Sequence, residues 1–423
     1  MKILLSVGYL PKINFANINI EINIARYFAS HGIECIIFGI SDEETSIKEI
    51  SKNVFIHKYE VDKISNNSLL ELEKFMKKDN TQVLNRNITI KFILMHPLHA
   101  MCIFLSKTYL KRLFREIKYK NYIKKLIKDS EIKVIIGFSY PFHMAKISFV
   151  KGFRGTKVYY QFDPHGLHET LPQEYKNSRI TEEVKLMNKS NICFTTNELY
   201  LQYKDNILYK DVLPKINAID FPTLKFNLNL EEKKLFNKKN INVVYCGTID
   251  DSFRSPRYFL EIIEPLIQKN NNIKLYFIGN IRSKDLELYS EKYSDSIFLL
   301  PPVTPVEAEQ YINNSDILIN ISNSITNMVP SKIFEYYSTG KPIINIQKIK
   351  NCSSKKYFEK YPLQVTLSEY LNDKKNDRSI LKEFILGKNK EKVDKEVINK
   401  LFYTNTIEYV GKLLIDRINE VTS

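Results

Sequence analysis

A strand–loop–helix–strand pattern between Ile317 and Ile346 constrains the fold of this chain more than any other feature. An apolar run opens the stretch, a polar loop follows it, and Pro330 stands where a helix should begin. Gly340 then precedes a second apolar run that starts at Ile343. Proline is favoured in the first turn of a helix and glycine just past its end. A short helix between two apolar strands is the repeating unit of a parallel sheet, so the stretch predicts an α/β fold.

The start of this helix carries side chains that suit an anionic ligand. Lys332 and Glu335 are three residues apart and share one helix face, and Ser331 precedes them. Free N–H groups at a helix start attract an anion, and a lysine beside them adds a full charge. A carboxylate one turn further can bind a pair of sugar hydroxyls. The combination suits a nucleoside diphosphate followed by its ribose, whereas the alternative is an ordinary crossover with a surface lysine and glutamate.

The length of 423 residues predicts more than one domain. Apolar strands alternate with helical patterns in both halves, and a stretch rich in Lys and Asn separates them. We predict an N-terminal Rossmann-like domain over 1–215, a linker over 216–240 and a C-terminal Rossmann-like domain over 241–399. A terminal helix is expected over Leu401–Ile418, within 400–423. The first strand is not followed by GxGxxG, so no dinucleotide site is indicated.

The composition indicates which class of partner and which cellular compartment to expect. The net charge of +15 and the pI near 9.2 indicate an anionic partner. The five cysteines are scattered and form no CxxC pair, which is typical of buried thiols in a reducing compartment and not of a zinc site. The apolar run that opens the chain is too short for a signal peptide, and no run of about 18 apolar residues predicts a transmembrane helix.

About half of the net charge lies in one short stretch. Between Lys107 and Lys128 there are nine basic residues and a single acid, Glu116, and apolar residues recur there at helical spacing. With the apolar run before it, 91–128 indicates a helix on an anionic membrane surface. The first alternative is a core helix with a solvated basic face. The second is a nucleic-acid helix, which we do not favour because no nucleic-acid module surrounds it.

Polar residues follow several predicted strands of the first half. His143 comes after the strand at 134–138, and Asp163, His165 and His168 come after the strand at 157–162. Open α/β sheets bind ligands at the carboxyl ends of their strands, so these residues are candidates for chemistry. Gly8 is expected to mark a tight turn after the first strand. The spacing of His165 and His168 lacks the helix and the glutamate of a zinc motif, so no metal site is predicted.

Four segments together resemble the GT-B glycosyltransferases, and within them the retaining, family 4-like enzymes of bacterial surface polysaccharides such as capsule or O-antigen. The most specific segment is Asp316–Ile344, and Val244–Pro256, Leu275–Gly279 and Leu300–Val303 are similar to neighbouring parts of the same domain. The resemblance covers most of 1–350 and is poor over 61–130. It implies two Rossmann-like domains facing across a cleft, with the C-terminal helix crossing back to the first domain.

The resemblance also implies an activity and a location. A hexose-type sugar would move from a nucleotide sugar to a saccharide or lipid-linked acceptor, with the enzyme in the cytoplasm on the inner face of the plasma membrane. Glu335 matches the residue that holds the donor ribose, Arg254 and Lys332 match basic positions near the diphosphate, and His143 matches the catalytic-region histidine. The chain has no DxD sequence, so we expect no metal and no other cofactor.

Two positions depart from the family pattern. Asn327 stands where a sugar-facing carboxylate is usual, and Thr248 stands where a basic residue is usual. The full set of expected site residues is His143, Arg254 and Lys332 for catalysis; Gly247, Arg254, Pro302, Val303, Asn327, Ser331, Lys332 and Glu335 for the donor; and Gly8, Asp163 and His165 for the acceptor.

Three other functions remain open from the sequence. A nucleotide-sugar epimerase would use the same donor half without an acceptor. A non-catalytic GT-B subunit would bind a nucleotide or a partner protein, and Asn327 is the feature that favours it. The interpretation as a nucleic-acid-binding protein is supported by the net charge alone, and we expect no nucleic-acid partner.

Overall fold

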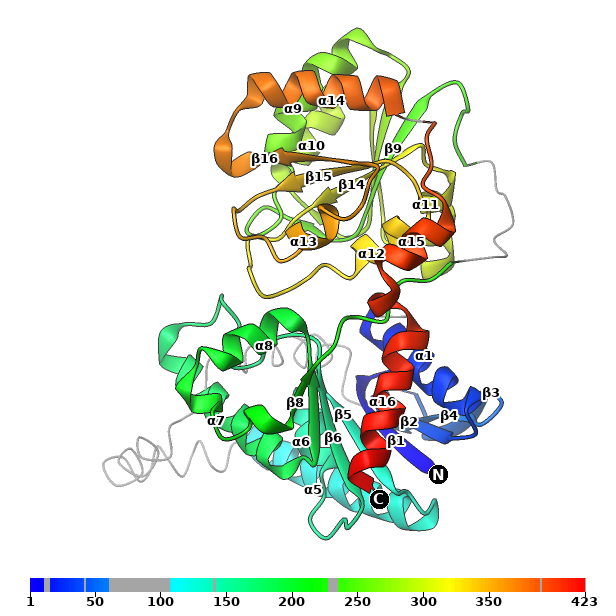
Figure 1. The fold of residues 1–423 in the computed structure, drawn as a ribbon, viewed down its shortest axis with the longest axis vertical. Helices are drawn as coiled ribbons and strands as arrows, with labels where there is room; N and C mark the ends of the chain where they lie inside the picture. The colour runs from blue at the N-terminus through cyan, green and yellow to red at the C-terminus, as the bar shows by residue number, and fades with distance from the viewer. Residues whose placement is uncertain are drawn as a thin grey trace. The chain divides into compact units, whose positions relative to one another are not determined.

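The computed structural model describes residues 1–10, 16–41, 43–60, 107–139, 142–226, 235–388 and 390–422. The chain divides into two compact α/β units (Figure 1). The N-terminal unit consists of Met1–Asp220 and Val410–Ser423, and the C-terminal unit of Phe221–Tyr409. The predicted α/β class with two Rossmann-like domains is confirmed.

The N-terminal unit is built on an eight-stranded sheet in the order β3-β4-β2-β1-β5-β6-β7-β8. Its strands are β1 (Lys2–Tyr9), β2 (Glu34–Ser41), β3 (Ser46–Ser51), β4 (Val54–Glu60), β5 (Val134–Phe138), β6 (Thr156–Gln161), β7 (Ile192–Thr195) and β8 (Ile216–Ala218). Neighbouring strands run parallel, except that β3 and β4 are antiparallel. The order of the strands reverses between β1 and β5, and such a switch point opens a crevice at the carboxyl ends.

Helices cover this sheet. They are α1 (Ala16–Ser30), α5 (Lys107–Asp129), α6 (Phe142–Ser148), α7 (Gln173–Lys189), α8 (Asn197–Lys204), the 3₁₀ turns η1 (Ile207–Tyr209) and η2 (Leu213–Lys215), and most of α16 (Ile407–Thr422). In α5 the apolar stripe Tyr119, Ile123 and Leu126 is buried in the core of the unit, while lysines occupy the opposite face. The described part of α5 therefore has the form of a core helix with a solvated basic face.

The C-terminal unit has a six-stranded parallel sheet in the order β13-β11-β9-β14-β15-β16, with β10 and β12 forming a separate pair. The strands are β9 (Ile241–Cys246), β10 (Ile249–Asp250), β11 (Ile273–Ile278), β12 (Ile281–Arg282), β13 (Ile297–Leu300), β14 (Ile317–Ile321), β15 (Ile343–Gln347) and β16 (Gln364–Ser368). Numbered within the unit, the sheet has the 3-2-1-4-5-6 order of a nucleotide-binding fold, with its switch point between β9 and β14.

The helices of the C-terminal unit lie between these strands in sequence. They are α9 (Arg257–Lys269), α10 (Lys284–Lys292), α11 (Pro305–Asn314), α12 (Lys332–Ser338), α13 (Lys355–Phe358), α14 (Lys374–Lys388), α15 (Lys395–Leu401) and the 3₁₀ turns η3 (Glu369–Leu371) and η4 (Tyr403–Asn405). In α9 one face is apolar and buried, including Phe259 and Ile263, as expected for a helix that covers a sheet.

The last helix returns to the N-terminal unit, as the resemblance implied. Leu414 and Ile418 of α16 are fully buried. A Cβ at Gly411 would lie 2.3 Å from the ring of Tyr27 in α1, so the two helices approach too closely there for a larger residue. Thr422 is also 2.9 Å from the hydroxyl of Thr156. These contacts assign the end of the chain to the N-terminal unit.

Three details differ from the sequence prediction. Ile216–Ala218, assigned to the linker, forms β8 and pairs with β7 in the N-terminal sheet. The edge strand β3 was not predicted, because its residues are mostly exposed and show no apolar alternation. The predicted single helix over Leu401–Ile418 is interrupted by a 3₁₀ turn, η4, because Thr406 pairs with Leu224 in a β-bridge.

Cysteine usage agrees with the prediction in the described part of the chain. Cys35, Cys193, Cys246 and Cys352 are buried and free. Burial raises the pKa of the Cys35 and Cys193 thiols to about 12, which keeps both protonated and unreactive. Cys102 lies outside the described residues, as does the part 91–106 of the predicted membrane stretch 91–128.

We expect Leu414→Ala to destabilise the N-terminal unit by about 2–5 kcal/mol, the usual cost of a cavity left by a fully buried leucine. Urea unfolding of the full chain measures the change. Lys412→Ala, on the exposed face of the same helix, is the control and should change stability by less than about 0.5 kcal/mol. Equal stability of Leu414→Ala and the wild type would show that α16 is not part of this core.

Candidate functional site

Arg254 is held in place at the carboxyl end of β9. Its Nε lies 3.0 Å from the side-chain oxygen of Asn323, which also accepts from Nη2, and its Nη1 donates to the carbonyl of Thr248 at 3.2 Å. The hydroxyl of Tyr245 donates to the same carbonyl at 2.8 Å. Asn323 follows β14, so Arg254 bridges the two strands that form the switch point. A half-buried guanidinium at such a point is placed to meet an anionic ligand.

Helix α12 is tied to the same place by Tyr336. The backbone N–H of Cys246, the last residue of β9, donates to the hydroxyl of Tyr336 at 2.9 Å, and that hydroxyl donates back to the carbonyl of Cys246 at 3.3 Å. Lys332 is four residues before Tyr336 and therefore lies on the same helix face. The hydrogen bonds consequently bring Lys332 to the end of β9.

Lys332 and Glu335 form an ion pair, with 2.5 Å between Nζ and Oε2. Both side chains keep about a third of their surface exposed, at 33% and 36%. Burial lowers the pKa of Lys332, but the carboxylate of Glu335, with Cys246 and Glu309, raises it above its ordinary value overall. Lys332 is therefore a permanent cation at neutral pH. The predicted common face of Lys332 and Glu335 is confirmed.

The start of α12 has fewer N–H groups available to an anion than its sequence suggests. The helix has seven residues, Ser331 has helical backbone angles, and its side chain makes no capping hydrogen bond. The N–H groups of Ile333 and Phe334 donate to the carbonyls of Pro330 and Ser331. Two of the N–H groups that could have met an anion are thus already used, and the positive charge here comes from Lys332 more than from the helix start.

Two glycines allow the strand ends to come together. Gly279, after β11, has φ of +135°, and a Cβ on it would lie 2.2 Å from the carbonyl oxygen of Gly247. The N–H of Gly247 bonds the carbonyl of Ile278, and that of Gly279 bonds Leu300. Any side chain at Gly279 would separate these strand ends. The edge formed by Gly247 and Gly279 continues to the segment after Leu300, which contains Pro302 and Val303.

Pro302 is exposed and Val303 half-buried, directly before a capped helix start. The Thr304 hydroxyl accepts from the N–H of Glu307, whose carboxylate accepts from the N–H of Thr304 at 2.9 Å. This capping box fixes the direction in which the chain leaves β13. Pro302 and Val303 are therefore presented at the same edge as Gly247.

Asn327 is buried, whereas its predicted contact with the donor sugar requires an accessible side chain. Only 1% of its surface is exposed. The sugar-facing role expected from the family pattern thus falls on a buried amide, which argues for a structural part in the loop before α12.

Sequence reasoning missed Lys348 and Asn323. Lys348 follows β15, its Nζ lies 3.1 Å from Glu369, and its backbone N–H donates to the hydroxyl of Ser322. Its Nζ also approaches the carbonyl of Ser255, next to Arg254, at 3.4 Å. Both missed residues directly follow apolar strands, which is the one signal that could have identified them.

In the N-terminal unit the candidate residues collect after β5 and β6, which are neighbours in the sheet. His143 is half-buried in the first turn of α6. The ring of His165 stacks on Phe142 with 3.7 Å between centroids and 10° between planes. The structure thus brings the loop of Asp163 and His165 to the start of α6. Gly8 differs from the prediction, because it lies inside β1 at a register shift and not in a turn after it.

Glu182 of α7 approaches the edge of the His165 ring. Its Oε2 lies 3.9 Å from Nε2 of His165, and its Oε1 3.4 Å from Nζ of Lys146. The interaction with His165 is the largest cause that lowers the pKa of Glu182, to about 2; burial opposes it and Lys146 reinforces it. Burial and Arg179 lower the pKa of His168, whose Nδ1 is 2.8 Å from the hydroxyl of Thr170.

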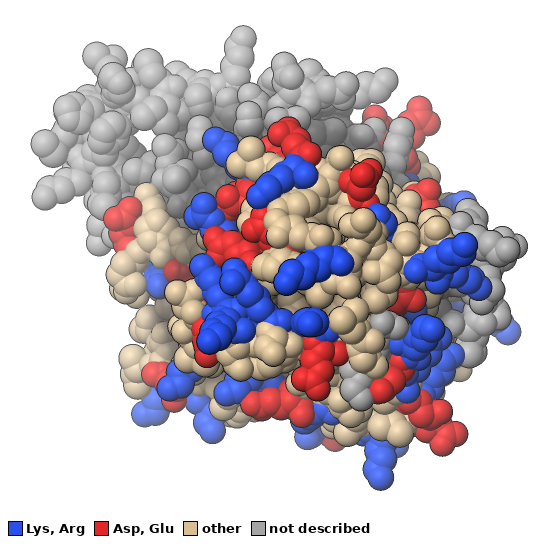
Figure 2. Space-filling view, turned by 90° about the horizontal axis from the view of Figure 1, so that it is seen from above, with Lys and Arg blue, Asp and Glu red and all other residues tan. Residues whose placement is uncertain are grey.

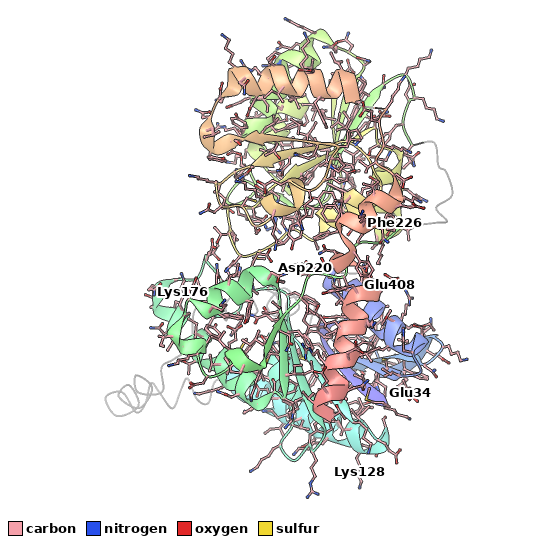
Figure 3. All side chains as sticks on the ribbon, viewed as in Figure 1. Glu34, Lys128, Lys176, Asp220, Phe226 and Glu408 are labelled. Atoms are coloured by element: carbon pink, nitrogen blue, oxygen red, sulfur yellow. The ribbon has the colours of Figure 1, made fainter. Side chains whose placement is uncertain are left out.

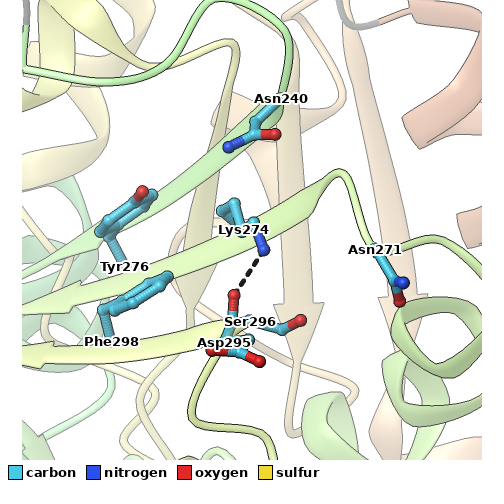
Figure 4. A pocket seen from close by; sticks show the side chains of 7 residues that line it. All are labelled: Asn240, Asn271, Lys274, Tyr276, Asp295, Ser296 and Phe298. Carbon is cyan, nitrogen blue, oxygen red and sulfur yellow. Dashed lines mark hydrogen bonds between the residues drawn. The ribbon is translucent and has the colours of Figure 1, made fainter.

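A pocket of about 410 Å³ lies elsewhere in the C-terminal unit (Figure 4). Its lining residues are Asn240, Asn271, Lys274, Tyr276, Asp295, Ser296 and Phe298. Several of these residues precede β9, β11 and β13, so the pocket extends to the amino ends of the strands, opposite Gly247 and Arg254. None of the residues predicted from sequence line it.

Among the described residues, none of the helices combines the length and the apolar composition that spanning a membrane requires. The same residues also contain no cluster of three or more His, Cys, Asp or Glu side chains that could hold a metal ion.

The family described as glycosyl transferases group 1 matches residues 240–353. This range contains Arg254, Asn323, Lys332 and Glu335, so the family match and the geometry concern the same part of the molecule. A search by sequence among curated proteins found no match.

Solved structures resemble the chain over its whole length. An α,α-trehalose-phosphate synthase (UDP-forming) from Burkholderia vietnamiensis has a TM-score of 0.64 at 8% identity, covering 100% of this chain and 97% of that chain. WaaG, a glycosyltransferase involved in lipopolysaccharide biosynthesis, gives 0.57 at 12%, covering 98% and 99%. The lipopolysaccharide outer core galactosyltransferase WaaB gives 0.53 at 13%, covering 99% of both. The fold is therefore that of the GT-B glycosyltransferases, and with the family match it supports a glycosyltransferase enzyme.

We expect Glu182→Gln to lower stability at neutral pH and to have no effect in strong acid. The folded-state pKa near 2 lies below the unfolded value near 4.5, so the ionised carboxylate stabilises the fold above pH 4.5, and this contribution disappears as the pH falls towards 2. Because the side chain is 34% exposed, we expect about 1 kcal/mol at pH 7. Urea unfolding at pH 7, 5 and 3.5 measures it, with the exposed Glu383→Gln as control. A difference that grows on acidification would contradict the assignment.

Proposed function

We propose that this chain is a metal-independent glycosyltransferase that moves a hexose-type sugar from a nucleotide sugar to a saccharide or lipid-linked acceptor in bacterial surface polysaccharide synthesis, with retention of configuration. The observation that carries the proposal is the pair of cations, Arg254 and Lys332, held at the switch point of the C-terminal unit. The ion pair of Lys332 with Glu335 supports a neighbouring position for the donor ribose. WaaG and WaaB, whose names refer to lipopolysaccharide, support the acceptor class.

In this proposal the two cations act on the leaving group. Breaking the bond between sugar and diphosphate leaves negative charge on the diphosphate. Arg254 and Lys332, already fixed by Asn323 and Glu335, stabilise that charge without reorganising. Gly247 and Gly279 leave the strand ends open to close approach by the diphosphate, and Pro302–Val303 lies beside the base. Two fixed positive side chains take the part that a divalent ion plays elsewhere.

The acceptor is assigned to the N-terminal unit. The loop of Asp163 and His165 and the start of α6 with His143 form its polar edge, and His143 is the proposed catalytic-region histidine. The epimerase alternative predicts turnover of a nucleotide sugar without an acceptor. The non-catalytic alternative, favoured by the buried Asn327, predicts nucleotide binding without any turnover.

Nucleotide affinity tests the donor site. We expect Lys332→Ala and Arg254→Ala each to weaken binding of UDP or GDP about 10- to 100-fold, since a hydrogen bond to a charged group contributes roughly 1.5–3 kcal/mol. Glu335→Ala should weaken nucleotide binding less than it weakens binding of the sugar-loaded donor. Titration calorimetry gives the dissociation constants, and the exposed Lys360→Ala is the control. Unchanged affinity in the first two variants would refute the donor site.

We also propose that the enzyme sits on the cytoplasmic face of the plasma membrane through charge alone. Lys118, Lys120, Lys124, Lys125 and Lys128 of α5 are exposed. Lys128, at the C-terminal end of the helix, is labelled in Figure 3. The buried stripe of α5 leaves these lysines as the part of the helix that can meet anionic lipid. On the face seen in Figure 2, basic and acidic side chains are interspersed, which gives little support to a nucleic-acid partner.

We expect the chain to float with vesicles that contain anionic lipid, and the triple variant Lys124→Glu, Lys125→Glu, Lys128→Glu to lose this binding. Each lysine near an anionic surface contributes about 1 kcal/mol. A variant with the same charge change in the C-terminal unit, Lys238→Glu, Lys239→Glu, Lys284→Glu, should keep it. Retained flotation of the α5 variant would place the membrane contact elsewhere, and insensitivity to 0.5 M salt would rule out attachment by charge.

A further inference from the structure

A buried carboxylate joins the core of the N-terminal unit to the loop that follows β6. Glu183 of α7 has no exposed surface. One of its oxygens accepts a hydrogen bond from the side-chain amide of Gln161. The other accepts from the hydroxyl of Tyr209 and from the backbone N–H of Gly166, the latter at 3.4 Å. All three partners are donors, so both carboxyl oxygens of Glu183 act as hydrogen-bond acceptors.

Gln161 carries this constraint into the loop. It is the last residue of β6, and it is fully buried. Its amide nitrogen also donates to the carbonyl of Asp163 at 3.0 Å, while its amide oxygen accepts from the hydroxyl of Tyr203 at 2.5 Å. Both ends of the amide are bonded, so its rotation would break several hydrogen bonds at once.

Helix α7 contacts the same loop at two further points. A Cβ on Gly166 would lie 2.8 Å from Cα of Ile180, so the loop and the helix approach as closely as a glycine permits. Glu182, the neighbour of Glu183, approaches Nε2 at the edge of the His165 ring, while Phe142 stacks on the face of that ring. The segment 162–168 is therefore held through its backbone, through Gln161 and through the ring of His165.

Stability alone does not explain a carboxylate at this position. Burying a network of polar side chains is costly, and well-packed apolar residues in place of the whole network would be at least as stable. The carboxylate instead determines orientation, because it holds the side-chain amide of Gln161 and the backbone N–H of Gly166 in place. Polar positioning of this kind is what a reacting site requires, since a displacement of 1 Å can cost roughly 100-fold in rate.

We propose that Glu183 is a positioning residue of the acceptor side, which sets where Asp163 and His165 lie by holding Gln161 and the N–H of Gly166. The inference rests on the proposed glycosyl transfer and concerns a residue that touches neither substrate. Replacing Glu183 should displace the segment 162–168 while leaving the donor half in the C-terminal unit unchanged.

The test compares the full-length wild type with Glu183→Gln, which keeps the shape and removes the second acceptor oxygen. Turnover is followed as nucleoside diphosphate release from whichever of UDP-glucose, UDP-galactose, UDP-N-acetylglucosamine and GDP-mannose the wild type uses. We expect kcat to fall at least 10-fold, with the dissociation constant of UDP or GDP unchanged within two-fold. Amide hydrogen exchange should accelerate over 162–168 and not over 241–254.

Two further variants separate positioning from loss of stability. Leu199→Ala removes a fully buried side chain of α8 from the same core and changes no residue of the segment 162–168 or of its hydrogen-bond network, so it should lower the melting temperature and keep kcat within two-fold. Gly166→Ala pushes the loop away from Ile180 and leaves Glu183 intact, so it should reproduce the loss of kcat, and it serves if Glu183→Gln does not fold.

The outcomes are distinct. Wild-type kcat and wild-type exchange in Glu183→Gln, or an equal loss of kcat in Leu199→Ala, would overturn the positioning role. If the wild type binds none of these nucleotides and turns over no nucleotide sugar, the proposed function fails. The exchange comparison then still decides whether Glu183 holds the segment.

Discussion

The hydrogen bonds between Tyr336 and the backbone of Cys246 hold the charged side chains of the C-terminal unit in one place. Cys246 is the last residue of the central strand β9. By satisfying both backbone groups, a single hydroxyl docks α12 at the switch point. Lys332 and Glu335 share the adjacent turn, so their position follows from this contact and not from their own ion pair.

In the N-terminal unit, too, a buried polar side chain positions a partly exposed element. There the carboxyl group of Glu183 holds the loop after β6, whereas in the C-terminal unit the phenol of Tyr336 holds the helix that carries Lys332. In both units the residues that determine the geometry are fully or almost fully buried, and the residues assigned to chemistry are partly exposed. Preorganisation of this kind depends on the surrounding shell as much as on the groups that meet the ligand.

Much of the fold followed from local pattern. The strands at 134–138 and 317–321 were predictable because buried parallel strands are continuous apolar runs bounded by turn residues. Edge elements were harder: β3 is exposed and β16 only partly buried, so neither has an apolar run of its own. β8 has three residues, too few to show any period. These strands exist because a neighbouring strand offers unpaired hydrogen-bonding groups, which is information from the tertiary structure.

The parts of the site that could be predicted are the charged residues that follow a predicted strand. Arg254, Lys332 and Glu335 lie together in the same unit, but the importance of Tyr336 and Glu183 could not be read from sequence, since each acts through a contact with a residue at least 22 positions away. Conversely, the burial of Asn327 and the inward-facing stripe of α5 depend on packing.

The return of α16 to the N-terminal unit has a consequence for synthesis of the chain. The sheet of that unit is complete once β8 has been made, yet the helix that supplies Leu414 and Ile418 to its core comes last. Synthesis of residues 221–409 takes about 10 to 40 s at roughly 5–20 residues per second. During that interval the apolar surface of the N-terminal unit that α16 covers stays exposed, while the C-terminal unit can already fold. The unit that begins the chain is thus the one that is finished last.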